Sequence, residues 1–112
     1  GQLMRDGRVR RAYLGVAGGP RPVPPQARAE AGADTCVEVV EVVSGSPADR
    51  AGLRPEDLIL AVDGTQITRV EDLQRLMVAA LIGISVTVRL LRAGRPLEVE
   101  LVPAELDSGD AR

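Results

Sequence analysis

The hydrophobic positions of this chain fall into short runs separated by glycine and proline. In the last third the pattern alternates strictly, because every second position is apolar from Ile84 to Leu90 and again from Leu97 to Leu101. A period of two is typical of half-buried β-strands, and Arg92-Ala93-Gly94-Arg95 between the two runs predicts a turn. We therefore expect a strand over Ile84 to Leu91, with Ile84 facing inward, and a last strand that contains Leu97 to Leu101.

Two earlier runs rich in valine and leucine, Cys36 to Val43 and Leu58 to Val62, also predict strands. Glu38 and Glu41 lie on opposite faces of the first run, so a bulge or an exposed strand end is expected there. Asp63-Gly64 directly follows the second run and predicts a tight hairpin.

A first strand is expected over Tyr13 to Ala17, which Gly18-Gly19-Pro20 then interrupts. Proline has no N–H to give to a β-ladder, so pairing along this strand is expected to be short. Pro24-Pro25 then predicts the start of a small helix over Gln26 to Ala31.

Two further helices begin at recognisable capping residues. Ser46 is a good N-cap for a short helix from Pro47 to Ala51. Thr68 and Glu71 have the spacing of a capping box before a helix from Val70 to about Leu81. With five or six short strands and two or three helices, the predicted class is α+β: a small, partly open β-barrel or sandwich capped by helices.

Composition removes several classes of function. The chain has 112 residues, which suits one domain, and its net charge of −2 with a single aromatic residue argues against nucleic-acid binding. It has no His and no Lys, so it has neither a Ser-His-Asp triad nor a Ser-Lys dyad, and we expect this chain not to be an enzyme. Cys36 is the only cysteine, so we expect a small core residue, no disulfide, no metal site and no cofactor.

No apolar run approaches the ~18–20 residues that span a bilayer, so no transmembrane segment is expected. No signal peptide is recognisable either. The chain begins with Gly1-Gln2-Leu3-Met4, and we interpret it as a domain of a longer protein.

Three segments in fixed order carry a family resemblance. Tyr13-Leu14-Gly15-Val16 comes first, Gly45-Ser46-Pro47-Ala48-Asp49-Arg50-Ala51-Gly52-Leu53 second, and Asp57-Leu58-Ile59-Leu60-Ala61-Val62-Asp63-Gly64 third. Together they resemble a PDZ domain, in particular the one that follows the protease domain in bacterial HtrA-type, trypsin-like serine proteases. The resemblance runs from about Gly7 to Val102, nearly the whole chain.

PDZ domains bind an extended peptide at a sheet edge beside a helix, and a nest of backbone N–H groups takes its terminal carboxylate. Leu14, Gly15 and Val16 are the candidate carboxylate-binding loop. The candidate groove residues come from the same region and from the helix that begins at Val70; they are Arg11, Tyr13, Ala17, Gly18, Val70, Leu73, Gln74 and Met77. The expected pocket is aliphatic and uncharged, which predicts a C-terminal ligand residue such as Val, Leu, Ile or Ala.

Three of these residues have alternative roles. Arg11 either helps to neutralise the carboxylate or is a solvated linker residue. Tyr13 is expected mainly to pack, with its hydroxyl at the surface, and Gln74 to be a rim contact. The edge expected at Val16-Ala17-Gly18 pairs with about three or four ligand residues.

The resemblance divides the chain into a linker from a preceding protease domain at 1–11, the PDZ domain at 12–104 and a disordered tail at 105–112. It implies a module that captures substrates and regulates a covalently linked serine endoprotease. The implied location is extracytoplasmic, in protein quality control, and the parent protein can be membrane-anchored. The alternatives are the PDZ domain of a non-proteolytic scaffold or secretion protein, or of another protease such as an intramembrane metalloprotease.

Overall fold

The computed structural model describes residues 10–77 and 81–107. Its centre is a six-stranded sheet with strand order β3-β4-β5-β7-β8, and β6 pairs separately with β5. Every pairing in it is antiparallel. The strands are β3 (Val16–Pro22), β4 (Thr35–Val42), β5 (Leu58–Val62), β6 (Thr65–Gln66), β7 (Val86–Arg92) and β8 (Arg95–Leu101).

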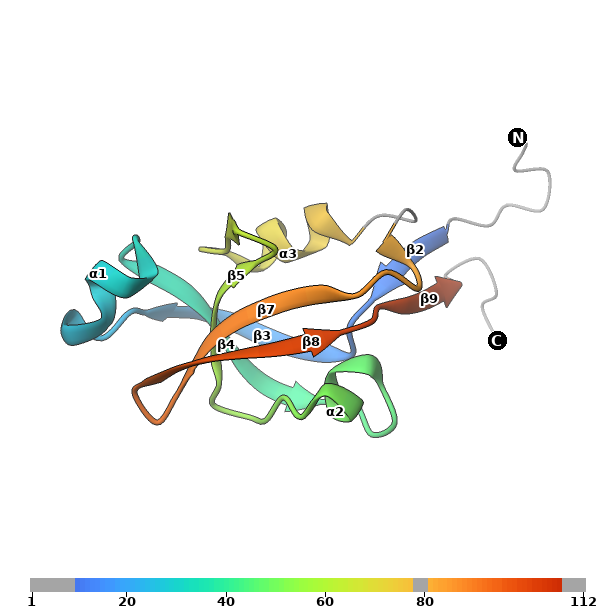
Figure 1. Cartoon of the computed structure of the whole chain (residues 1–112), viewed down its shortest axis with the longest axis horizontal. Helices are drawn as coiled ribbons and strands as arrows, with labels where there is room; N and C mark the ends of the chain where they lie inside the picture. The colour runs from blue at the N-terminus through green and yellow to red at the C-terminus, as the bar shows by residue number, and fades with distance from the viewer. Residues whose placement is uncertain (1–9, 78–80, 108–112) are drawn as a thin grey trace.

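Two short strands form a separate ribbon at one end of the molecule. β2 (Arg10–Tyr13) pairs antiparallel with β9 (Ala104–Asp107), from Arg10 opposite Asp107 to Tyr13 opposite Ala104. The ribbon extends from the main sheet at the end opposite α1 (Figure 1). Residues 10–11, expected to belong to a linker, and residues 105–107, expected to belong to a disordered tail, are therefore part of this two-stranded sheet.

The helices lie around the main sheet. In the view of Figure 1, α3 (Val70–Leu76) lies above the sheet and α2 (Pro47–Ala51) below it. The 3-10 turn η1 (Pro25–Ala27) leads into α1 (Arg28–Ala31), as the two prolines predicted. The expected class, α+β with a partly open sheet capped by helices, is confirmed.

The core is aliphatic, as the composition requires. One large cluster packs between the sheet, α2 and α3, and its fully buried members include Val39, Ile59 and Leu90. A second cluster under η1 and α1 contains Cys36, whose side chain is fully buried. This burial confirms the expectation of a small core residue there, and it raises the pKa of the Cys36 thiol.

The first strand differs from the prediction. The chain turns at Leu14 and Gly15, and β3 then continues from Val16 through Pro20 to Pro22. The expected interruption at Gly18-Gly19-Pro20 is wrong, because an edge strand tolerates a proline whose nitrogen faces away from its partner. The bulge anticipated from the glutamate parity is present: Ala17 pairs with Glu41 and Gly18 with Val39, which leaves Val40 as the extra residue.

The helix over 70–81 is shorter than predicted and is capped one residue later. α3 ends at Leu76, with Met77 as its C-cap; residues 78–80 lie outside the described part. The expected box of Thr68 and Glu71 is wrong, because Asp72 takes the acceptor role: its Oδ2 accepts from Thr68 N (2.9 Å), Thr68 Oγ1 (3.0 Å) and Arg69 N (3.2 Å). These bonds, those from Thr68 first, lower the pKa of the Asp72 carboxyl.

The strand expected to begin at Ile84 begins at Val86 instead. Ile84 is 52% exposed, so its predicted inward orientation is wrong. Gly83 donates its N–H to the Pro103 carbonyl and Ile84 to that of Leu81, which holds this segment in a turn. The alternation of Val86, Val88 and Leu90 toward the core is confirmed.

A buried ion pair ties the end of β7 to the loop after α2. Asp57 is 1% exposed, and Arg92 donates to both of its oxygens, from Nε to Oδ1 at 2.9 Å and from Nη2 to Oδ2 at 2.8 Å. The same Nη2 donates to the Gly52 carbonyl at 2.8 Å. This pairing raises the pKa of Arg92, whose guanidinium joins the end of β7 to two points of the loop after α2.

Candidate peptide-binding groove

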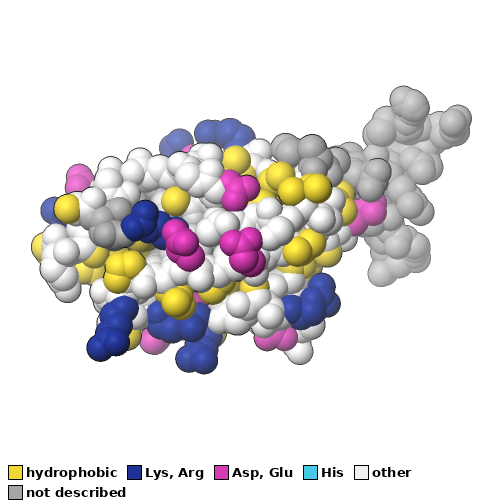
Figure 2. All heavy atoms as spheres, viewed as in Figure 1, with side chains coloured by type: hydrophobic (Ala, Val, Ile, Leu, Met, Phe, Trp, Pro, Cys, Tyr) yellow, Lys and Arg dark blue, Asp and Glu magenta, His cyan; other side chains and the backbone are white. Residues whose placement is uncertain are grey.

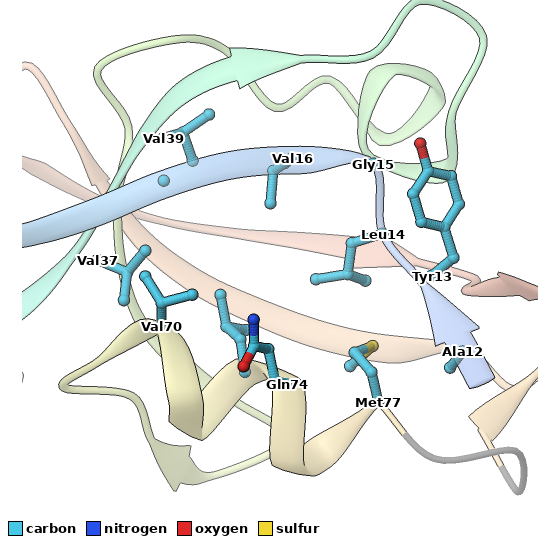
Figure 3. Close-up of a pocket in the computed structure, with 12 residues that line it drawn as sticks. Ala12, Tyr13, Leu14, Gly15, Val16, Val37, Val39, Val70, Gln74 and Met77 are labelled. Atoms are coloured by element: carbon cyan, nitrogen blue, oxygen red, sulfur yellow. The ribbon is translucent and has the colours of Figure 1, made fainter. Parts of the chain in front are cut away.

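A groove of about 270 Å³ lies between β3 and α3. No lining residue carries a formal charge, and Tyr13 and Gln74 supply the only polar side chains. The lining residues are Ala12, Tyr13, Leu14, Gly15, Val16, Gly18, Val37, Val39, Val70, Leu73, Gln74 and Met77. In Figure 3, Val70, Gln74 and Met77 rise from α3 on one side, and Leu14 and Val16 face them from the other.

The loop at the end of this groove has its carbonyl groups fixed. The Leu14 oxygen accepts from Ala48 N in α2, and the Gly15 oxygen accepts from Val43 N, both at 2.8 Å. Within the described residues, the N–H groups of Leu14 and Gly15 donate to no acceptor. A short loop with fixed carbonyls and unused donors is suited to an anion such as a carboxylate.

Only glycine fits at the centre of this loop. Gly15 has φ +90°, a conformation that other residues adopt at a cost. A Cβ at this position would lie 2.1 Å from Ser46 Cβ and 2.4 Å from Ser46 Oγ. Ser46 is also the N-cap of α2, accepting from Asp49 N at 3.2 Å, so the loop packs directly on a capped helix end.

The N-terminal cap of α3 determines how α3, the side of the groove opposite β3, is placed. Asp72 holds the backbone of Thr68 and Arg69 at the start of α3, immediately before Val70. Val70 is half-buried, and Leu73 and Met77 are buried beneath the groove. The cap therefore fixes the position of the residues that face β3.

The structure brings most of the predicted site residues together. Leu14, Gly15 and Val16 form one end, and Tyr13, Gly18, Val70, Leu73, Gln74 and Met77 line the rest. The Tyr13 ring lies beside Gly15 and not between β3 and α3 (Figure 3), and its hydroxyl is 3.4 Å from where a Gly15 Cβ would be. Ala17 is exposed and does not line the groove.

Arg11 lies in β2 opposite Leu106. Its side chain lies outside the described part of the chain, so its role at the carboxylate stays a prediction.

Three lining residues, Ala12, Val37 and Val39, were not predicted from the sequence. The two valines alternate along β4, which pairs directly with β3, so they form the floor of the groove. Their alternation is visible in the sequence, but their place under the groove depends on the strand order. Ala12 reaches the site because β2 leads directly into the loop at Leu14.

On the face in Figure 2, basic, acidic and apolar side chains are interspersed. Among the described residues, no group of three or more Cys, Asp and Glu side chains has the arrangement of a metal site. In the same part of the chain, no helix has the length and apolarity to cross a membrane.

A sheet edge that faces a helix across an apolar groove, closed by a Leu-Gly-Val loop, defines a PDZ domain. A family model described as PDZ domain matches residues 38–92. The chain belongs to the PDZ family.

The relatives support this placement. The chain is 30% identical over 117 residues to a protein of Chlamydia trachomatis named as a probable DegP-like periplasmic serine endoprotease; the match covers 97% of this chain and 22% of that protein. A protein of Mesorhizobium japonicum named as a zinc metalloprotease is 37% identical over 73 residues, covering 65% of this chain and 20% of the relative. The chain therefore spans about a fifth of the length of these relatives.

Two solved structures show the same fold. The serine endoprotease of Yersinia pestis superposes with a TM-score of 0.72 at 30% identity, over 95% of this chain and 33% of that one. The HtrA3 PDZ domain bound to a phage-derived ligand, FGRWV, superposes with a TM-score of 0.67 at 23% identity, over 95% of this chain and 98% of that one.

Proposed function

We propose that this domain binds the free C-terminus of a polypeptide whose last residue is apolar. The observation that carries the proposal is the groove itself: an uncharged, aliphatic channel that ends at the unused N–H groups of Leu14 and Gly15. The carboxylate would accept hydrogen bonds from this loop, and the terminal side chain would pack among Leu14, Val16 and Met77. The peptide backbone would add to the free edge of β3.

The expected affinity is modest. A ligand of a few residues buries much less than the ~1,200 Å² of a standard protein interface. Apolar burial of one or two side chains and charge-assisted bonds to one carboxylate together give roughly −5 to −8 kcal/mol, which corresponds to millimolar to micromolar dissociation constants. Such weak and reversible binding suits a domain that samples many chain ends.

We infer that the parent protein is a trypsin-like serine endoprotease and that this domain presents substrates to it or regulates it. The inference is supported by a DegP-like relative that matches 97% of the chain, whereas the metalloprotease relative matches 65%. The name of the DegP-like relative also supports an extracytoplasmic, periplasmic location. A role in protein quality control is what the resemblance to HtrA-type proteases implies. A metalloprotease parent is the second candidate, favoured only by that shorter match.

The direct test compares two forms of one ligand. An eight-residue peptide ending in valine is prepared as the free acid and as the C-terminal amide, and backbone amide shifts of the domain are followed by NMR. The acid is expected to bind at least about tenfold more tightly, because the amide removes the charge that the loop N–H groups stabilise. The largest shifts are expected at Leu14, Gly15 and Val16.

Two variants with the same introduced residue locate the ligand. Val70→Arg places a long charged side chain in the groove, and Glu71→Arg places it one residue further along α3 on an exposed position that does not line the groove. Binding is expected to be lost in the first and kept in the second. Equal binding of acid and amide, or equal behaviour of the two variants, would refute a carboxylate-directed groove.

A further inference from the structure

The free edge of β3 changes its hydrogen-bonding capacity halfway along. In an antiparallel pair, the N–H and C=O of one residue face the same side, and neighbouring residues face opposite sides. Val39 donates to the Asp57 carbonyl at 2.8 Å and accepts from Glu56 N at 2.7 Å, so its backbone faces away from β3. Its partner Gly18 therefore faces the open edge.

The same alternation assigns the rest of the strand. Pro20 pairs with Val37 and Pro22 with Thr35, at the same parity as Gly18, so both prolines also face the open edge. At the other end, Val43 donates to the Gly15 carbonyl at 2.8 Å, so this carbonyl faces β4. The Val16 N–H lies on the opposite side of the same trans peptide bond, so Val16 faces outward. The open edge is thus formed by Val16, Gly18, Pro20 and Pro22.

These four positions do not offer the same groups to a ligand. Val16 and Gly18 each present an N–H and a C=O, but the two prolines present only a C=O, because proline nitrogen carries no hydrogen. A peptide whose last residue lies opposite Val16 has its third-last residue opposite Gly18 and its fifth-last opposite Pro20. From the fifth-last residue onward, the carbonyl groups of the peptide find no donor on the edge.

We propose that Pro20 and Pro22 end the ligand ladder, so that the groove recognises about the last four residues of a free C-terminus and does not accept an internal extended segment. This proposal rests on the proposed function above. The limit lies in missing donors and not in the length of β3, which continues to Pro22. An internal segment lacks the carboxylate and would depend on a longer ladder, which this edge does not provide.

The same prolines protect the empty domain. An unpaired strand edge is a template for pairing with other chains, and natural sheets place proline on such edges to prevent it. A short ladder next to a carboxylate-binding loop therefore gives capture of chain ends without promiscuous strand pairing.

The test is a length series on the intact domain and on Pro20→Ala. Four-residue and eight-residue free-acid peptides share their last four residues, and an eight-residue amide represents an internal segment; dissociation constants are measured by NMR or calorimetry. For the natural sequence, the two acids are expected to agree within about twofold, and the amide to bind at least tenfold more weakly. Pro20→Ala adds an edge N–H, and one added backbone hydrogen bond is expected to tighten the eight-residue acid about three- to tenfold while leaving the four-residue acid unchanged.

The matched control is Gly19→Ala, because Gly19 faces β4 and a Cβ there meets no atom within 4 Å. Gly19→Ala is expected to leave the affinities for the four-residue and the eight-residue acids unchanged. The amide introduced by Pro20→Ala should also become protected from hydrogen exchange only when the eight-residue acid is bound.

The outcomes separate the two proposals. If neither acid binds the natural sequence, the proposed function fails. If both acids bind but the eight-residue acid is more than fivefold tighter, the ladder limit is overturned while the carboxylate groove stands. The natural-sequence series gives this answer even if Pro20→Ala does not fold; if Pro20→Ala folds and gains nothing for the longer acid, the assignment of Pro20 as the end of the ladder is overturned.

Discussion

Replacing Gly15 by alanine tests whether the carboxylate loop depends on close packing against α2. Two separate costs are expected. The first is conformational: at φ +90° an L-residue costs about 1–2 kcal/mol, and the reduced freedom of the unfolded chain returns about 0.4–1 kcal/mol, so about 1 kcal/mol remains. The second is steric, because the new Cβ would lie 2.1 Å from Ser46 Cβ.

The steric cost can be estimated from what must move. Ser46 cannot keep both its position and its hydrogen bond to Asp49 N, and loss of an N-cap typically costs about 1 kcal/mol. Gly15→Ala is therefore expected to lose about 2–3 kcal/mol in total. For a domain of this size, each 1 kcal/mol lowers the melting temperature by roughly 4–8 °C, so a decrease on the order of 10–20 °C is expected.

Two other glycines separate the terms. Gly52 has φ +92° and a Cβ there meets no atom within 4 Å, so Gly52→Ala isolates the conformational cost of about 1 kcal/mol. Gly19 has neither problem, and Gly19→Ala is expected to change stability by less than about 0.5 kcal/mol. Urea and thermal unfolding of all three variants measure the series. If Gly15→Ala is no less stable than Gly52→Ala, the argument from close packing is refuted.

Two further predictions concern the buried pair and the α3 cap. Arg92→Met leaves the buried Asp57 carboxylate with the Arg54 N–H as its remaining donor. Urea unfolding should show a loss of stability of about 2 kcal/mol, which is below the usual range for a buried pair because Arg92 is partly exposed. A loss under about 0.5 kcal/mol would mean that the pair behaves as a surface ion pair. The lowered pKa of Asp72 means that its carboxylate stabilises the fold above its unfolded-state pKa and loses this effect as the pH falls through its folded-state pKa. Asp72→Asn should therefore be less stable than the natural sequence at pH 7, and the difference should disappear in the acid range below pH about 4; a pH-independent difference in unfolding midpoints would contradict this.

Local signals in the sequence predicted the elements whose hydrogen bonds are local. The helix from Pro47 to Ala51 with its Ser46 cap, and the alternation of Val86, Val88 and Leu90, were both visible without the structure. The cap of α3 differs from the prediction because the sequence offers two neighbouring acidic partners for Thr68, namely Glu71 and Asp72. The structure uses Asp72, and only the backbone geometry distinguishes the two.

Strand order was the information that the sequence lacked. Pro20 was interpreted as a strand breaker because the sequence does not reveal that β3 is an edge strand, where an outward-facing proline is tolerated. For the same reason Val37 and Val39 were identified as strand residues but not as the groove floor. Ala12 was placed next to a linker because its partner strand lies about ninety residues further along the chain.

The ribbon of β2 and β9 determines how the domain responds to tension. Arg10 and Asp107 lie opposite each other at its outer end, and Tyr13 and Ala104 at its inner end. A force that pulls these two strand ends apart would therefore break the residue pairs one after another from the outer end, and not all at once. The last pair to open would be that of Tyr13, immediately before the Leu14-Gly15 loop, so tension on the domain would act directly on the ligand site.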